Sequence, residues 1–250
     1  MKYVIKIILI VTCLIIMLPF GGCGRKKQVT AQKAGVLKPE APGKEVLDHG
    51  EVVVDISNVA QGYVALRYKG SAKKISVEVI GKNNKVYKYF IERTKEPTYF
   101  PLTSGNGTYQ ISVYENVQDD EYSVLMMDSF EVKLENKFLP FLYPNQYVEF
   151  TSKTKAVKEA KKLAKDSKDD LAIVKAVYNY VVKNVKYDDE KAQNVQSGYL
   201  PSVDETLKTK KGICFDYAAL MTAMLRSQGI PTKLEIGYSG DIYHAWISTW

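Results

Sequence analysis

Two residues near the C-terminal end of the sequence have types and an order that could carry nucleophilic chemistry. They are Cys214 and His244, both within the stretch KGICFDYAALMTAMLRSQGIPTKLEIGYSGDIYHAWISTW. A cysteine thiolate is a strong nucleophile, and a neutral imidazole within hydrogen-bond reach can accept its proton and later protonate a leaving amine. The pair is therefore a candidate for acyl transfer. The alternative for Cys214 is a small buried hydrophobic residue, the usual condition of a free cysteine.

The residues around Cys214 predict a helix that begins at the cysteine. Gly212 precedes it, and Gly229 with Pro231 behind it is typical of a C-terminal stop. Between these limits, apolar residues recur at helical spacing: Ala218, Met221 and Leu225. A cysteine in the first turn of a helix faces the positive end of the helix dipole and several unpaired N–H groups. Both favour a thiolate and offer donors to an oxyanion.

A predicted hairpin carries the histidine. Residues 232–238 and 242–250 alternate in the manner of strands, with a turn at Ser239-Gly240-Asp241 between them. We expect this hairpin to pack against the helix, with His244 on one face. Such packing permits a contact between His244 and Cys214, and spacing alone does not establish it.

These motifs, taken in order, resemble the core of the transglutaminase-like superfamily, a branch of the papain-like cysteine enzymes. The stretch GICFDYAALMTAMLRSQGIPTKLEIGY contains the Arg-x-x-Gly-Ile-Pro turn of that family at residues 226–231, and the family's His-Ala-Trp lies at residues 244–246. The upstream VVKNVKYDDE is similar to the helix end and Tyr-Asp of bacterial members. The resemblance covers roughly residues 155–250.

The resemblance implies a catalytic triad with Cys214 as nucleophile and His244 as general base and acid. The family's third member, an aspartate that orients the imidazole, lies on the strand after the histidine, and the sequence ends at Trp250. Asp241 is too near in the turn, and Asp216 is better suited to supporting the helix N-terminus. We therefore expect a fragment of a longer gene product with a C-terminally incomplete domain, which should be a poor enzyme as it stands.

The implied reaction is attack of the thiolate on a peptide or glutamine amide, which forms a thioester and releases an amine or ammonia. Water would then give a protease or amidase, and an amine would give a cross-link; the sequence does not choose between them. The expected partner is a protein or cell-wall peptide substrate. The alternative is a non-catalytic surface module that binds cell-wall or protein ligands, because a fold alone does not guarantee activity.

The N-terminus resembles a bacterial lipoprotein signal. Residues 1–22 have a basic start, an apolar run too short to span a membrane and small residues before Cys23. Phe20 departs from the family pattern, which usually has leucine there. The resemblance implies export, lipidation of Cys23 and an extracytoplasmic, membrane-anchored location at the bacterial surface. An uncleaved anchor or ordinary secretion is the alternative. Cys214 would then be the only thiol of the mature chain, without a disulfide partner.

The middle of the chain predicts a second, all-β region. We interpret residues 23–50, which are polar and lysine-rich, as a tether. Residues 51–135 contain strand-like runs separated by turn signals, which favour an immunoglobulin-like β-sandwich. The expected strands are residues 63–69, 74–81, 85–92, 108–115 and 128–135. Its many tyrosines are explained by strand propensity as well as by a binding face.

A linker and two helices complete the expected architecture. Residues 136–152, with two prolines and many apolar positions, suit a linker packed against both regions. Residues 153–250 then form the α+β domain, beginning with two amphipathic helices whose lysines we expect to face solvent. The expected core stripe of the second helix consists of Leu171, Val174, Tyr178, Val181 and Val185.

Composition adds no cofactor to this interpretation. The formal charge is +7, and no motif points to nucleic acid. Two distant histidines and a single mature thiol are too few for a typical zinc site, and no acidic loop suggests calcium. We therefore expect no cofactor and no metal.

Overall fold

The computed structural model describes residues 35–92, 96–118 and 121–250. They lie within one compact unit, Gln32–Trp250. The expected signal at residues 1–22, the lipidation site Cys23 and the first part of the tether lie outside the described residues.

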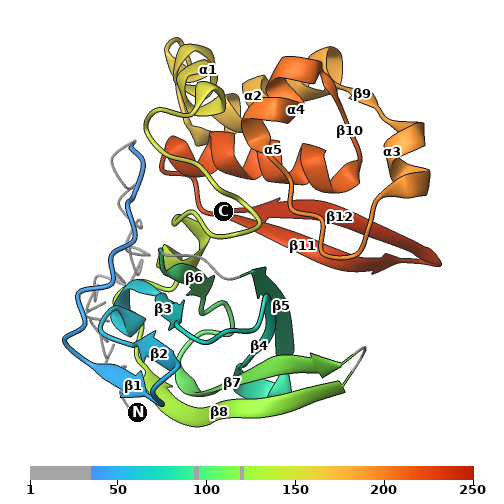
Figure 1. Ribbon diagram of the computed structural model, residues 1–250. Coiled ribbons are helices and arrows are strands. Elements are labelled where there is room, and N and C mark those ends of the chain that lie inside the picture. Colours follow the sequence, from blue (N-terminus) through green and yellow to red (C-terminus); the bar gives the residue numbers. More distant parts are fainter. Residues whose placement is uncertain (1–34, 93–95, 119–120) are drawn as a thin grey trace, which may run out of the picture. The chain divides into compact units, whose positions relative to one another are not determined.

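The N-terminal part of the described chain is built from two four-stranded antiparallel sheets (Figure 1). The first has the order β1-β2-β3-β6 and the second the order β5-β4-β7-β8. The strands of the first sheet are β1 (Val46–Asp48), β2 (Val52–Asp55), β3 (Tyr63–Tyr68) and β6 (Thr98–Pro101). Those of the second are β4 (Lys74–Ile80), β5 (Val86–Glu92), β7 (Gly107–Gln118) and β8 (Glu121–Val132). Short 3-10 turns, η1 (Val59–Gln61) and η2 (Lys82–Asn84), lie between strands.

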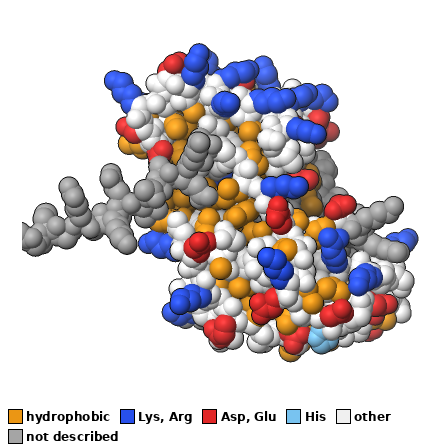
Figure 2. Space-filling view, turned by 90° about the vertical axis from the view of Figure 1, so that its left-hand side faces the viewer, with side chains coloured by type: hydrophobic (Ala, Val, Ile, Leu, Met, Phe, Trp, Pro, Cys, Tyr) orange, Lys and Arg blue, Asp and Glu red, His pale blue; other side chains and the backbone are white. Residues whose placement is uncertain are grey.

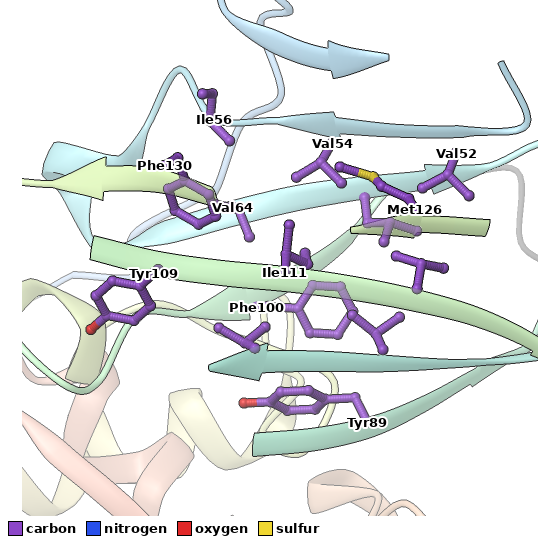
Figure 3. Packing of buried hydrophobic residues seen from close by; sticks show 14 of the residues in the cluster. Val52, Val54, Ile56, Val64, Tyr89, Phe100, Tyr109, Ile111, Met126 and Phe130 are labelled. Atoms are coloured by element: carbon purple, nitrogen blue, oxygen red, sulfur yellow. The ribbon is translucent and has the colours of Figure 1, made fainter. Parts of the chain in front are cut away.

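One buried cluster joins the two sheets. It combines alternate residues of the strands, as a period of two requires, and Figure 3 shows its aromatic and branched side chains meeting between them. Its fully buried members include Val52, Val64, Phe100, Ile111 and Val113. The β-rich character predicted for this region is confirmed, and its immunoglobulin-like form stays a prediction.

The strand-bearing region begins earlier than the sequence suggested. β1 lies inside the range expected for the tether and pairs with β2. The Gly43 N–H also donates to the Asp55 carboxylate over 2.6 Å, and the Glu40 N–H donates to the Tyr63 hydroxyl over 3.0 Å. The expected boundary at residue 50 is therefore wrong for the described residues, because these polar residues pair through their backbone, which composition does not reveal.

The segment 136–152 is packed, as expected for a linker that contacts both regions. Its 3-10 turn η3 (Leu139–Phe141) is buried, and the Pro140 ring lies so close to Gly62 that a β-carbon there would come within 2.5 Å. Farther along, Val148 and Phe150 join the buried cluster of the helices.

The C-terminal part combines helices with a hairpin. Its helices are α1 (Lys155–Ala164), α2 (Asp170–Asn184), α3 (Asp189–Asn194), α4 (Val203–Thr209) and α5 (Cys214–Ser227). A two-residue parallel pair, β9 (Lys186–Tyr187) with β10 (Lys211–Gly212), lies between them. The hairpin consists of β11 (Thr232–Ser239) and β12 (Ile242–Thr249), joined through Gly240, whose φ of +63° suits glycine. α5 is central, since it contacts α1, α2, α4 and both hairpin strands.

The core face of α2 matches the predicted stripe only in part. Val174, Val181 and Val185 pack in the helical core as predicted, whereas Leu171 and Tyr178 are 76% and 53% exposed, and Val177, outside the stripe, is fully buried. Apolar residues occur on two sides of this helix, so periodicity alone could not select the side that packs on α5. The lysines of α1 and α2 are exposed as predicted. In Figure 2, Lys and Arg side chains gather at the top of the view, the end that carries the helices.

The helices of the described residues are short. None of those in residues 35–92, 96–118 and 121–250 is both long and apolar enough to cross a bilayer.

Candidate active site

Cys214 is the first residue of α5, which confirms the predicted helix start. Ile213 precedes it in an extended conformation, and the Tyr217 N–H bonds back to the Ile213 carbonyl over 3.1 Å. The Cys214 side chain is half-buried. The thiol therefore lies at the positive end of the central helix, where solvent still reaches it and where the dipole favours a thiolate.

A buried carboxylate holds this helix start in place. Asp216 is fully buried and accepts hydrogen bonds from the Ile213 N–H at 2.8 Å, the Lys191 ammonium at 2.7 Å and the Tyr199 hydroxyl. The first of these bonds satisfies a backbone donor at the helix N-terminus, the role expected for this residue. Asp216 therefore positions Cys214 and is not available to orient a histidine.

The surroundings of Asp216 raise the pKa values of its two side-chain partners, Lys191 and Tyr199. Burial opposes protonation of Lys191, but the hydrogen bonds to Asp216 and Tyr199 outweigh it, so the pKa of the lysine is raised. Burial, followed by the hydrogen bond to Asp216, raises the pKa of the Tyr199 hydroxyl. Both groups therefore keep their protons at neutral pH, and the three side chains remain a hydrogen-bonded set.

Gly212 is required by a close approach to this set. A β-carbon at Gly212 would lie 2.6 Å from the Asp216 β-carbon and 3.1 Å from its Oδ2. Contacts this short are not tolerated without a shift of the chain. The glycine before the cysteine therefore lets Asp216 fold back onto the start of its own helix.

Tyr187 lies near the thiol and was recognised in the sequence only as part of the motif VVKNVKYDDE. It pairs with Gly212 across β9 and β10, and the Asp188 N–H donates to the Gly212 carbonyl over 3.0 Å. Burial raises the pKa of its hydroxyl and the neighbouring Cys214 raises it further. Because the side chain is 51% exposed, Tyr187 lies where it could contact a molecule that reaches the thiol.

His244 lies on β12, opposite Gly237 of β11, and its side chain is exposed. Ala245 is buried and Ile247 packs against the helical cluster. Because side chains alternate along a strand, His244 lies on the other face of the hairpin, together with Trp246.

The structure does not join the two candidate catalytic residues. Within the described ranges, no hydrogen bond links the Cys214 thiol with the His244 imidazole, and no carboxylate bonds to His244. Catalytic hydrogen bonds are often long or poorly aligned without substrate. The assignment of Cys214 and His244 as a pair therefore stays a prediction.

The turn that follows α5 is fixed by a buried arginine. Arg226 donates through Nε to the Thr232 carbonyl at 2.8 Å and through a terminal nitrogen to the Tyr143 carbonyl at 2.6 Å. Burial lowers its pKa to about 9, which leaves it charged at neutral pH. Gly229, with φ +80°, closes the helix behind it. The predicted Arg-x-x-Gly-Ile-Pro turn thus ties β11 and the linker to α5.

Metal ligands do not gather in the part of the chain that the structure describes. No group of three or more His, Cys, Asp or Glu residues is arranged there to hold an ion.

The C-terminal part of the chain is similar to a known protein family. Residues 158–250 match the family model of the transglutaminase-like superfamily. The UPF0252 protein MJ1282 of Methanocaldococcus jannaschii is 28% identical over 193 residues, which are 72% of this chain and 55% of that protein. The chain therefore spans about half the length of this curated relative.

Two solved structures are also similar. One is called a "putative cysteine protease" from Cytophaga hutchinsonii, with 19% identity, a TM-score of 0.41 and coverage of 86% of this chain and 64% of that chain. The other is called a "putative protease" from Parabacteroides distasonis, with 12% identity, a TM-score of 0.32 and coverage of 70% and 35%.

The family match spans α2, the helix that starts at Cys214 and the hairpin that carries His244. Residues 158–250 of this chain are a transglutaminase-like domain.

Proposed function

We propose that the transglutaminase-like domain is a cysteine-dependent acyl-transfer enzyme that acts on peptide or glutamine amides. The observation that carries this proposal is the half-buried Cys214 thiol at the first turn of the central helix. A thiol there has the helix dipole to favour the thiolate and backbone N–H groups to bind an oxyanion.

In the proposed reaction, the Cys214 thiolate adds to the amide carbonyl and gives a tetrahedral oxyanion. His244, having taken the thiol proton, returns it to the leaving nitrogen, so an amine or ammonia departs and a thioester remains. Water then attacks the thioester and regenerates the thiol, which makes the enzyme a protease or amidase. An amine in place of water gives a cross-link.

We further propose that the protein acts outside the cytoplasm, anchored to the membrane through lipid on Cys23. The signal-like layout of residues 1–23 supports this location. A protein or cell-wall peptide is then the substrate within reach.

A second candidate is a non-catalytic surface module that binds such peptides. It is favoured by the exposed His244, which bonds neither to Cys214 nor to a carboxylate among the described residues. In this case the thiol has no chemical role.

The test is the pH dependence of Cys214 alkylation by iodoacetamide in the full-length protein, compared with its His244→Ala variant. An ordinary thiol titrates at about pH 8.5. An enzyme should label rapidly below pH 7, and His244→Ala should abolish this rapid labelling. Cys214→Ala gives the background from other thiols.

Slow labelling that follows an ordinary thiol titration in both proteins would contradict the enzyme and leave the binding module. Rapid labelling that survives His244→Ala would keep a reactive thiol and remove the histidine from the proposed mechanism.

A further inference from the structure

A cavity of about 420 Å³ lies between two strands that are far apart in sequence. Its walls include the consecutive residues Lys85–Tyr89 at β5 and Lys233–Ile236 of β11. Since successive side chains of a strand point to opposite faces, a run of consecutive lining residues means that each strand presents its edge. The cavity therefore lies along two backbone edges.

The edge of β11 is open along part of its length. The Trp250 N–H bonds to the Pro231 carbonyl, which fixes the alternation of the antiparallel ladder. The backbone N–H and C=O of Thr232 consequently point away from β12, and this carbonyl accepts a hydrogen bond from Arg226. By the same alternation, the backbone groups of Leu234 and Ile236 point outward, and within the described ranges β11 pairs with β12 alone.

The edge of β5 is partly occupied. The Gly81 N–H bonds to the Lys85 carbonyl, so the backbone groups of Val86 and Lys88 point away from β4. The Lys88 carbonyl already accepts from the Tyr147 hydroxyl at 3.3 Å. β11 therefore offers the better template for an added strand, and β5 offers side chains opposite it.

Cationic side chains dominate the lining of the cavity. They are Lys85, Lys88, Arg226 and Lys233. Of these, Lys88 also lies 3.6 Å from Glu78, and the buried Arg226 is bonded to two backbone carbonyls. The acidic residue of the lining is Glu235, which already binds Lys233 at 2.8 Å and the Ser248 hydroxyl at 2.5 Å. Tyrosines complete the wall. The charge therefore complements an occupant that carries carboxylates.

We propose that this cavity binds an extended acidic peptide, which adds as a strand to the open edge of β11. Outward backbone groups of Leu234 and Ile236 would pair with the peptide backbone, and Lys85 and Lys88 would meet its carboxylates. At about 3.3 Å per residue, the lining of β11 accommodates three to four peptide residues.

A ring contact connects the lining of the cavity with the first turn of α5. Tyr147 lines the cavity, and its ring lies 5.7 Å from that of Phe215, the residue after Cys214. A longer peptide held here would have its continuation near the start of α5. The inference rests on the proposed function only in calling this peptide a substrate, and peptide binding is measured without catalysis.

The test is fluorescence polarisation with the Cys214→Ala chain, so that no turnover occurs. The probe is a fluorescein-labelled Glu-Val-Glu-Val-Glu-Val peptide at low salt. We expect saturable binding, with at least about tenfold weaker binding of the Lys-Val repeat. A Glu-Val peptide N-methylated at alternate residues loses backbone donors and should bind about tenfold more weakly.

Protein variants test the location of the site. The double charge reversal Lys85→Glu with Lys88→Glu should weaken binding by about tenfold. Lys158→Glu, at an exposed position of α1, is the matched control and should leave affinity within about twofold. The N-methylated peptide requires no protein change, so it tests the edge pairing even if the double variant folds poorly.

Three results would overturn the proposal: no saturable binding of the acidic peptide, equal binding of its N-methylated form, or equal loss in the Lys158→Glu control. Alkylation of Cys214 is measured separately. An active thiol without peptide binding would therefore refute this site alone, and peptide binding with an inert thiol would refute the enzyme alone.

Discussion

Replacement of the buried Asp216 by asparagine should destabilise the transglutaminase-like domain by about 2–3 kcal/mol. The asparagine oxygen, placed at the Oδ2 position, can still accept from the Ile213 N–H and from Lys191, but it carries no charge to pair with the ammonium. The NH₂ group at the Oδ1 position cannot accept from the Tyr199 hydroxyl. Hydrogen bonds to a charged group contribute about 1.5–3 kcal/mol each, and breaking a buried ion pair costs about 3–5 kcal/mol. The Lys191 side chain is 30% exposed, so it regains hydration, and the expected loss lies at the lower end.

The assay is urea unfolding followed by tryptophan fluorescence. The chain has two tryptophans, Trp246 and Trp250, and both lie in the transglutaminase-like domain. The signal therefore reports the unfolding of the domain that contains Asp216, whatever the β-rich region does.

The matched control is Asp189→Asn, the same chemical change at an exposed position in the first turn of α3. It should change the free energy of unfolding by less than about 0.5 kcal/mol. If Asp216→Asn falls within the same range, the buried cluster does not hold the helix start, and our account of how Cys214 is positioned is refuted.

Two further changes test the same domain. Gly212→Ala should cost about 1–3 kcal/mol in the same urea assay, because its β-carbon would meet the side chain of Asp216 at 2.6 Å; an unchanged unfolding midpoint would show that the backbone yields freely. Burial opposes ionisation of Glu235, but hydrogen bonds from Lys233 and Ser248 outweigh it and lower its pKa. Its stabilising contribution is therefore present above the ordinary glutamate value of 4.5 and is lost as pH falls through the lowered pKa. Glu235→Gln should consequently flatten the acid limb of the stability curve, and identical acid limbs in the two proteins would contradict this.

Features that depend on short-range pattern could be predicted from the sequence. The start of α5 at Cys214, its end shortly before Gly229 and the hairpin beyond it follow from spacing and turn residues, which act locally. The β-rich character of the first region follows from alternation for the same reason.

Features that depend on contacts between distant parts of the chain could not be predicted from the sequence. The pairing of β9 with β10 involves two residues on each side, too few to leave a periodic signal. The contact of Lys191 with Asp216 joins residues 25 positions apart, and neither charge is distinctive in a lysine-rich sequence. The side of α2 that is buried depends on how α2 packs against α5, and the sequence of α2 alone carries no information about that packing.

The candidate site illustrates the same division. The sequence placed the candidate nucleophile Cys214 correctly at a helix start, because helix starts have recognisable neighbours, but placing a histidine against it requires the twist and packing of a hairpin. Alternation assigns His244 to one face and does not say which face looks toward the cysteine.

The guanidinium of Arg226 has a consequence for the order of folding. It joins the Thr232 carbonyl, six residues away, to the Tyr143 carbonyl, 83 residues away. During synthesis the linker leaves the ribosome long before α5. The Tyr143 carbonyl therefore stays hydrated until the Arg226 guanidinium is available to donate to it. α5 and the hairpin can form from local contacts, but the charge at their junction loses its hydration only when the earlier segment docks. The junction of linker, helix and hairpin should therefore close as one late, cooperative step.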